Sequence, residues 1–141
     1  MTLPYFIAAL IPAGYQLASF AASLRFIFRR TPQPRSTAPV SILKPVCGLD
    51  CGFEEAIESH AAQDYPEYEI LLGVHSMGDP AVPAIQRLIA AHPDVPIRLI
   101  CSGTVAQNAK VGSLIELARQ ARFPVLLMND SDVTVPRNYL R

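Results

Sequence analysis

The fold is decided by a near-continuous apolar stretch, Tyr68-Glu69-Ile70-Leu71-Leu72-Gly73-Val74. It does not show the strict alternation expected of a strand that has one face in water. Such a run suits a strand that is covered on both faces, as strands are in parallel sheets. The stretch therefore predicts a buried strand of an α/β fold.

Predicted strands and helices alternate on both sides of this stretch. Further strands are predicted at Val40–Lys44, Ile97–Cys101 and Val125–Met128. Periodic apolar residues predict helices over Phe53–Ala61, from Pro80 onward and over Ala109–Ala121. The order β-α-β-α-β-α-β predicts a mostly parallel sheet between helices over residues 40–141. His60 falls on the apolar stripe of the first of these helices and is interpreted as a packing residue.

The amino-terminal segment is apolar and carries no charge from Leu3 to Leu24. A helix needs roughly 20 such residues to cross a bilayer, so a transmembrane helix is predicted over residues 1–28. The arginines that follow it, among them Arg25 and Arg29, predict a single pass with the globular part in the cytoplasm. A cleaved signal peptide is the alternative, but its basic residues would precede the apolar run. Residues 29–39, rich in Pro and Arg, are predicted to form a linker.

The charge distribution argues against a nucleic-acid partner. The formal net charge is zero, yet Asp and Glu outnumber Lys and Arg from Ser36 onward. Three cysteines, Cys47, Cys51 and Cys101, are too few and wrongly spaced for a zinc site. Their predicted cytoplasmic location argues against disulfides.

Two carboxylates follow the last apolar run, in the sequence Asn129-Asp130-Ser131-Asp132. Carboxylates this close repel each other unless a proton or a cation lies between them. Hard divalent cations such as Mg2+ or Mn2+ prefer oxygen ligands. Asp130 and Asp132 are therefore predicted to hold a metal that bridges to a phosphate ligand, and the alternative is an acidic turn that merely ends a strand.

Ligands of open α/β sheets bind beyond the carboxyl ends of the strands. The corresponding loops span Lys44–Asp50, His75–Asp79, Ser102–Lys110 and Asp130–Asp132. None of them contains a glycine-rich phosphate cradle. A phosphate ligand is therefore expected to be held by metal and lysine.

Several of the loop residues have a structural alternative. Asp79 precedes Pro80 and suits a helix N-cap, and Asn108 suits one too. Asp50 is interpreted as a cap or turn residue that is also a candidate ligand residue. Lys110 lies in the first turn of its helix, where the dipole disfavours a cation, so an anionic ligand explains it better.

The motifs and their order resemble those of ceramide glucosyltransferases and of their bacterial relatives, the membrane glycosyltransferases of hopanoid synthesis. The likeness covers nearly the whole chain, and its motifs are Val40-Ser41-Ile42-Leu43-Lys44-Pro45, Gly48-Leu49-Asp50, Gln63-Asp64-Tyr65-Pro66-Glu67-Tyr68, Asp79-Pro80, Asn108-x-Lys110 and Asp130-Ser131-Asp132.

The resemblance implies a GT-A nucleotide-sugar-binding fold and an inverting, membrane-bound glycosyltransferase. Such an enzyme would transfer a sugar from a UDP-sugar to a ceramide-like or hopanoid-like lipid. Asp79 would contact the base end of the donor, and Lys110 would lie near its phosphates. Asp130 and Asp132 would form the metal and diphosphate motif with Mn2+ or Mg2+. The remaining expected nucleotide-sugar-binding residues are Lys44 and Asp50.

The sequence departs from this family in two respects. Asp132 replaces a glycine that is usual in the ceramide enzymes, which favours the bacterial branch. The family's expected base and its Gln-x-x-Arg-Trp element would lie downstream of Arg141, so no residue is assigned as the catalytic base. The chain is expected to be a donor-binding fragment that does not transfer sugar by itself.

Two other functions stay open at the level of sequence. The motif around Asp130 also resembles the nucleophile of haloacid-dehalogenase-type phosphatases, with Asp132 as acid and base. That motif normally lies on the first strand of its domain, whereas three strand-helix units precede it here. The other function is a non-enzymatic, membrane-anchored interaction domain in which the acidic turn is structural.

Overall fold

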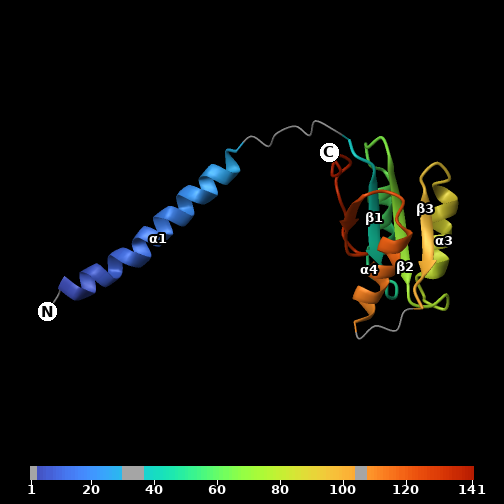
Figure 1. Cartoon of the computed structure of the whole chain (residues 1–141), viewed down its shortest axis with the longest axis horizontal. Coiled ribbons are helices and arrows are strands. Elements are labelled where there is room, and N and C mark those ends of the chain that lie inside the picture. The colour runs from blue at the N-terminus through green and yellow to red at the C-terminus, as the bar shows by residue number, and fades with distance from the viewer. Residues whose placement is uncertain (1–2, 30–36, 104–107) are drawn as a thin grey trace. The chain divides into compact units, whose positions relative to one another are not determined.

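The chain was analysed as a computed structural model that describes residues 3–29, 37–103 and 108–141 (Figure 1). It divides into two compact units, Met1–Pro34 and Arg35–Arg141. Most of the predicted 29–39 linker, including Arg30 and Arg35, lies outside the described residues. The second unit contains the sheet and the candidate site.

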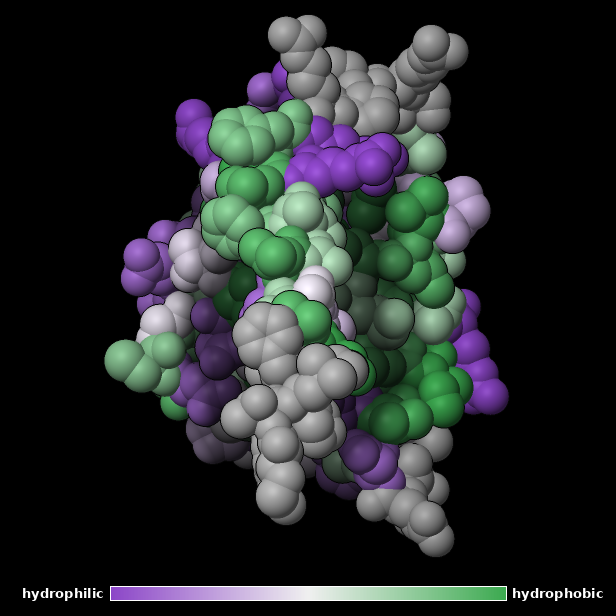
Figure 2. Space-filling view, turned by 90° about the vertical axis from the view of Figure 1, so that its left-hand side faces the viewer, coloured by the Kyte–Doolittle hydropathy of each residue, from purple (hydrophilic) through white to green (hydrophobic). Residues whose placement is uncertain are grey.

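The first unit consists of helix α1, Leu3–Ile27, which is 25 residues long. Its described large apolar side chains, from Leu10 to Ile27, are exposed. Apolar residues are green in Figure 2, which shows green surface exposed on the face it presents. The prediction of a helix is confirmed, but the prediction of a membrane span is not. Within the described ranges, no helix combines the length and the apolarity needed to cross a membrane. The sequence argument relied on missing charge, whereas Gln16, Ser19 and Ser23 also lower the apolarity of this helix.

The second unit is built on a parallel sheet of four strands in the order β3-β2-β1-β4. The strands are β1 (Val40–Pro45), β2 (Tyr68–Val74), β3 (Ile97–Cys101) and β4 (Val125–Met128). In the registers of β1, Val40 lies opposite Tyr68 of β2 and opposite Val125 of β4. The predicted α/β fold and its strands are confirmed, with β1 one residue longer than expected.

Helices cover both faces of this sheet (Figure 1). Helices α2 (Phe53–Ala61) and α3 (Val82–Ala91) pack on one face, and α4 (Ala109–Gln120) packs on the other. Neighbouring strand residues point to opposite faces, so Ile42 joins the core with α2 and α3 while Leu43 joins the core with Leu117 of α4. The second unit thus forms three layers, with helices outside and the sheet between them.

Two details differ from the expectations. Helix α3 begins at Val82 rather than at Pro80, because Asp79 to Val82 first form a turn closed by the Val82 amide and the Asp79 carbonyl. Strand β4 is not covered on both faces: Val125 is 43% exposed and Met128 is 64% exposed. In the part of the chain that the structure describes, β4 is an edge strand that pairs with β1 alone.

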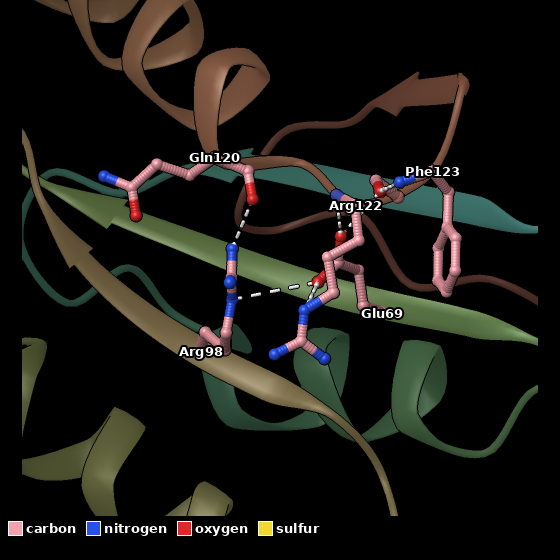
Figure 3. Close-up of polar contacts among 6 residues, drawn as sticks. Glu69, Arg98, Gln120, Arg122 and Phe123 are labelled. Carbon is pink, nitrogen blue, oxygen red and sulfur yellow. Dashed lines mark hydrogen bonds and ion pairs between the residues drawn. The ribbon is translucent and has the colours of Figure 1, made fainter.

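A buried carboxylate organises the amino-terminal ends of the strands (Figure 3). Glu69 of β2 is fully buried and accepts hydrogen bonds from Ser41 Oγ and from the Arg122 amide, each at 2.7 Å. Its second oxygen faces the guanidinium groups of Arg98 at 3.7 Å and Arg122 at 3.9 Å. Glu69 thereby connects β1, β3 and the segment between α4 and β4 to β2.

The carboxyl-terminal half of β2 lies close to α4 at Gly73. A Cβ atom at this position would lie 2.5 Å from Ser113 Oγ and 3.0 Å from Leu117 Cδ1. Only glycine leaves room for the helix at this distance from the sheet. The contact sets the distance between α4 and the sheet, and thereby positions the first turn of α4 near the carboxyl ends of the strands.

We predict that Gly73→Ala destabilises the protein by about 1–3 kcal/mol, the usual cost of overpacking a core. Urea unfolding followed by circular dichroism measures this change. Gly78→Ala is the matched control, because a Cβ there would meet its nearest neighbour, Ser76 Oγ, at an ordinary 3.6 Å. Equal stability of the two variants would show that α4 is not held as closely as described.

Candidate nucleotide-sugar site

The site lies where the strand order reverses. The chain runs outward from β1 through β2 to β3 and then crosses to β4 on the other side of β1. Sheets of this kind bind ligands in the crevice at such a switch point, beyond the carboxyl ends of the strands. A cavity of about 310 Å3 lies there and is lined by residues that follow β1, β2 and β4 and by the start of α4: Pro45, Val46, Cys47, Asp50, His75, Ala109, Lys110, Ser113, Asp130, Ser131 and Asp132.

The two carboxylates predicted as metal ligands both line this cavity. Lys110 Nζ is 2.6 Å from Asp130 Oδ1, and both side chains are 56% exposed. An exposed pair of this kind contributes at most about 1 kcal/mol. A phosphate can therefore replace Asp130 as the partner of Lys110, and the freed carboxylate can then bind a cation.

The residues present fit a divalent cation that is shared with a phosphate ligand. No cluster of three or more candidate metal-binding side chains occurs within residues 3–29, 37–103 and 108–141. Asp130 and Asp132 supply two carboxylate groups, whose oxygens suit Mg2+ or Mn2+. Mg2+ is commonly held by one or two carboxylates together with substrate phosphates and water. Two carboxylate ligands are typical of a metal site that is completed by substrate and water, and not of one built from protein ligands alone.

Lys44, at the end of β1, lies behind this pair of carboxylates. Its side chain is fully buried, and Nζ donates to the main-chain oxygen of Asp130 at 2.6 Å. Burial lowers the pKa of Lys44 to about 8, although the charges of Asp132 and Asp130 act in the opposite direction. Lys44 is not among the residues that line the cavity. The observed contact is support of the acidic turn, and nucleotide-sugar contact by Lys44 stays a prediction.

Asp79 is likewise not among the residues that line the cavity. Its carboxylate accepts from the Gly48 amide at 3.1 Å and from the Ala81 amide at 2.9 Å. Gly48 has φ +74°, a conformation that glycine adopts readily. Asp79 thus ties the loop after β1 to the turn before α3. The N-cap of α3 is Ala81, so the interpretation of Asp79 as a helix N-cap is wrong. Contact with the base of a nucleotide is not tested by this geometry.

The other expected residues have distinct positions. Asp50 lines the cavity and begins a turn in which its carbonyl oxygen accepts from the Phe53 amide at 3.2 Å. The turn interpretation is confirmed, whereas the N-cap of α2 is Gly52 and not Asp50. Asn108 is an N-cap: its Oδ1 accepts from the Lys110 and Val111 amides. Residues 104–107 of the loop before α4 lie outside the described residues.

Two cavity residues were not singled out from the sequence. His75 directly follows β2, and its position at a strand exit was the available signal. Ser113 is buried on α4, and its Oγ has no hydrogen-bond partner among the described residues. Ser113 lies one helical turn after Lys110, so the two side chains share one side of α4. The sequence could have indicated Ser113 only if α4 had been known to face the site.

His60 of α2 is fully buried and contacts the residue before Asp130. Nδ1 lies 2.8 Å from the Ala56 oxygen, and Nε2 lies 3.1 Å from Asn129 Nδ2. Because a carbonyl oxygen only accepts, Nδ1 carries the proton and Nε2 accepts from Asn129. Burial lowers the pKa of His60 to about 4, helped by the positive charge of Lys44 and opposed by the Ala56 hydrogen bond. The packing interpretation is confirmed, with the added contact to Asn129.

This pKa predicts a loss of stability in acid. Between pH 6.5 and pH 4 the unfolded chain protonates its histidine while the folded protein does not, so the free energy of unfolding falls as the pH falls. The loss assigned to His60 reaches about 3 kcal/mol at most. Urea unfolding at pH 7 and pH 4.5 measures it. His60→Gln, which cannot titrate, should lose less stability over this interval than the wild type, and equal losses would contradict the assignment.

Comparison with solved structures defines the class of fold. The mannosyltransferase PcManGT from Pyrobaculum calidifontis, solved in complex with GDP-Man and Mn2+, aligns with a TM-score of 0.70 at 22% identity. The alignment covers 92% of this chain and 39% of PcManGT. TarS from S. aureus, in complex with UDP-GlcNAc, aligns with a TM-score of 0.50 at 19% identity over 70% of this chain and 28% of TarS. The second unit has the GT-A glycosyltransferase fold, as predicted.

The sequence gives the family. Residues 4–141 match the model of Glycosyl transferase family 21, and the chain belongs to this family. Ceramide glucosyltransferase 1 of Caenorhabditis elegans is 33% identical over 103 residues, which are 72% of this chain and 22% of that protein. The chain thus spans about a quarter of the length of the curated relatives it matches. Family membership leaves neither the phosphatase nor the non-enzymatic hypothesis with support.

Proposed function

We propose that this chain supplies the donor-binding part of an inverting glycosyltransferase that transfers a sugar from a UDP-sugar to a lipid alcohol. The carrying observation is the cavity at the switch point between β1 and β4, which brings Asp130, Asp132 and Lys110 together. Two carboxylates and a lysine on one wall suit a diphosphate bound with a divalent cation.

In this proposal each polar residue of the cavity has a defined task. Asp130 and Asp132 would hold Mn2+ or Mg2+, and Lys110 would turn from Asp130 to a phosphate oxygen. When bound there, the metal would neutralise charge on the diphosphate as the glycosidic bond breaks. Asp50, which also lines the cavity, would accept hydrogen bonds from donor hydroxyl groups. No described residue is assigned as the acceptor base.

The similar proteins support the class of donor and acceptor. PcManGT was solved with GDP-Man and Mn2+, and TarS was solved with UDP-GlcNAc, so the fold accommodates nucleotide sugars. Ceramide glucosyltransferase 1 is named for the transfer of glucose to ceramide, which favours a ceramide-like acceptor. A hopanoid-like acceptor rests on the resemblance of the sequence motifs alone. Uridine as the base rests on the resemblance of the sequence motifs and on the UDP-GlcNAc complex of TarS, whereas PcManGT was solved with GDP-Man, so UDP and GDP must be compared directly.

The first test is metal-dependent binding of the nucleotide. We expect UDP to bind detectably only with Mn2+ or Mg2+ and more tightly than GDP, as measured by titration calorimetry. Asp130→Asn should weaken this binding by more than about 1 kcal/mol, since it removes a charge-assisted contact. Asp94→Asn is the matched control, because it removes the same charge from an exposed residue between α3 and β3. Unchanged binding by Asp130→Asn would refute the metal site.

Asp79 requires a separate test, because support of the Gly48 loop and contact with the base predict different results. If Asp79 contacts the base, Asp79→Asn weakens the metal-dependent binding of UDP, and we expect this outcome. Asn keeps one oxygen acceptor for the backbone amides, so the loss of stability should be below about 1 kcal/mol. Calorimetry and thermal unfolding measure the two effects. A variant with lower thermal stability and unchanged UDP affinity would leave Asp79 a purely structural residue.

A further inference from the structure

We propose that His60 is a positioning residue that sets the direction of the Asp130–Asp132 turn through the side chain of Asn129. The proposal rests on the proposed function, since it concerns the same two carboxylates. His60 itself does not line the cavity, so it acts through its neighbour and not on a ligand.

The imidazole is held rigidly. Its Nδ1 donates to the Ala56 oxygen within the same helix at 2.8 Å, and its side chain is fully buried. The ring of Tyr139 packs against it edge to face, with ring centres 6.3 Å apart and planes at 76°. Nε2 is therefore a fixed acceptor that points from α2 toward the end of β4.

Asn129 is fixed at both of its ends. Its backbone amide donates to the Leu43 oxygen at 3.1 Å, which continues the pairing of β4 with β1. Its side chain reaches His60 Nε2 at 3.1 Å on the other side of the backbone. The next residue, Asp130, has its carbonyl oxygen held by Lys44 Nζ at 2.6 Å. Anchors on two consecutive residues determine where the Asp130 carboxylate emerges.

Helix α2 also holds the chain beyond the turn. The Val135 amide donates to Ser59 Oγ at 3.0 Å. Just after the end of α2, Gln63 Nε2 donates to the Pro136 oxygen at 2.9 Å. Residues 129 and 135 are thus attached to neighbouring positions of one helix, His60 and Ser59. The acidic turn lies between these attachments, so α2 supports it from both sides.

A neutral imidazole suits this task. Lys44 already places one positive charge next to the turn, and a second one at His60 would oppose the binding of a cation there. A neutral imidazole avoids this repulsion and can accept the hydrogen bond from Asn129. Removing the acceptor leaves the Asn129 amide group unpaired in a half-buried place. The turn would then sample other directions.

Two variants separate positioning from packing. The Oε1 atom of Gln reaches the place of Nε2, so His60→Gln keeps an acceptor for Asn129. The side-chain amide of Asn reaches the place of Nδ1, so His60→Asn keeps the bond to Ala56 and loses the acceptor. Both introduce a smaller polar group into the same buried space and should lower the melting temperature by similar amounts.

The closing experiment measures the Mn2+-dependent UDP affinity of the 141-residue chain and, without ligand, hydrogen–deuterium exchange of the peptide that contains residues 129–132. We expect His60→Asn to weaken binding about fivefold or more and to speed exchange, while His60→Gln stays within about twofold of the wild type. Asn129→Ala should reproduce His60→Asn, and the double variant should add little, because both remove one interaction.

Equal behaviour of His60→Asn and His60→Gln in both measurements would overturn the proposal. A wild-type chain that shows no metal-dependent UDP binding would refute the proposed function instead. Exchange would then still decide the role of His60, because it is measured without nucleotide or metal.

Discussion

The buried carboxylate of Glu69 is the interaction on which the rest of the second unit depends. A charge inside a protein is tolerated only when it is paired and hydrogen-bonded. Glu69 therefore keeps Ser41, Arg98 and the Arg122 amide close to β2. These contacts hold β1, β3 and the segment that leads into β4 at one end of the sheet (Figure 3). With that end fixed, the carboxyl ends of β1 and β4 must lie next to each other.

The charged groups at the two ends of the sheet differ in solvent exposure, and this difference separates a structural role from ligand binding. Glu69 has no exposed surface, and one of its oxygens accepts from Ser41 Oγ and the Arg122 amide, so no ligand from solvent can reach it. Asp130 and Lys110 are more than half exposed, so their mutual attraction is weak enough to be exchanged for a ligand. The buried group stabilises the architecture, whereas the exposed pair remains available for chemistry.

The sequence predicted those features that depend on neighbouring residues. Continuous apolar runs predicted the bounds of the strands Tyr68–Val74 and Val125–Met128. The carboxylate pair was predicted because Asp130 and Asp132 are separated by a single residue in the sequence. Contacts between distant residues had no local signal: His60 meets Asn129 across 69 positions, and Gly48 meets Asp79 across 31. The burial of Lys44 was missed for the same reason, since a lysine at a strand end is usually solvated. For α1, the absence of charge was an insufficient criterion of a membrane span.

The position of β4 beside β1 has a consequence for the order in which the molecule assembles. The bond from Lys44 to Asp130 joins residues 86 positions apart, and the strand that supplies Asp130 is the last of the four along the chain. Such a contact closes a long loop, so it forms slowly compared with the pairing of β1 to β2. During synthesis, β1 therefore presents an unpaired edge until β4 has emerged. The Lys44–Asp130 contact, and the candidate site around it, can therefore form only after β4 has emerged.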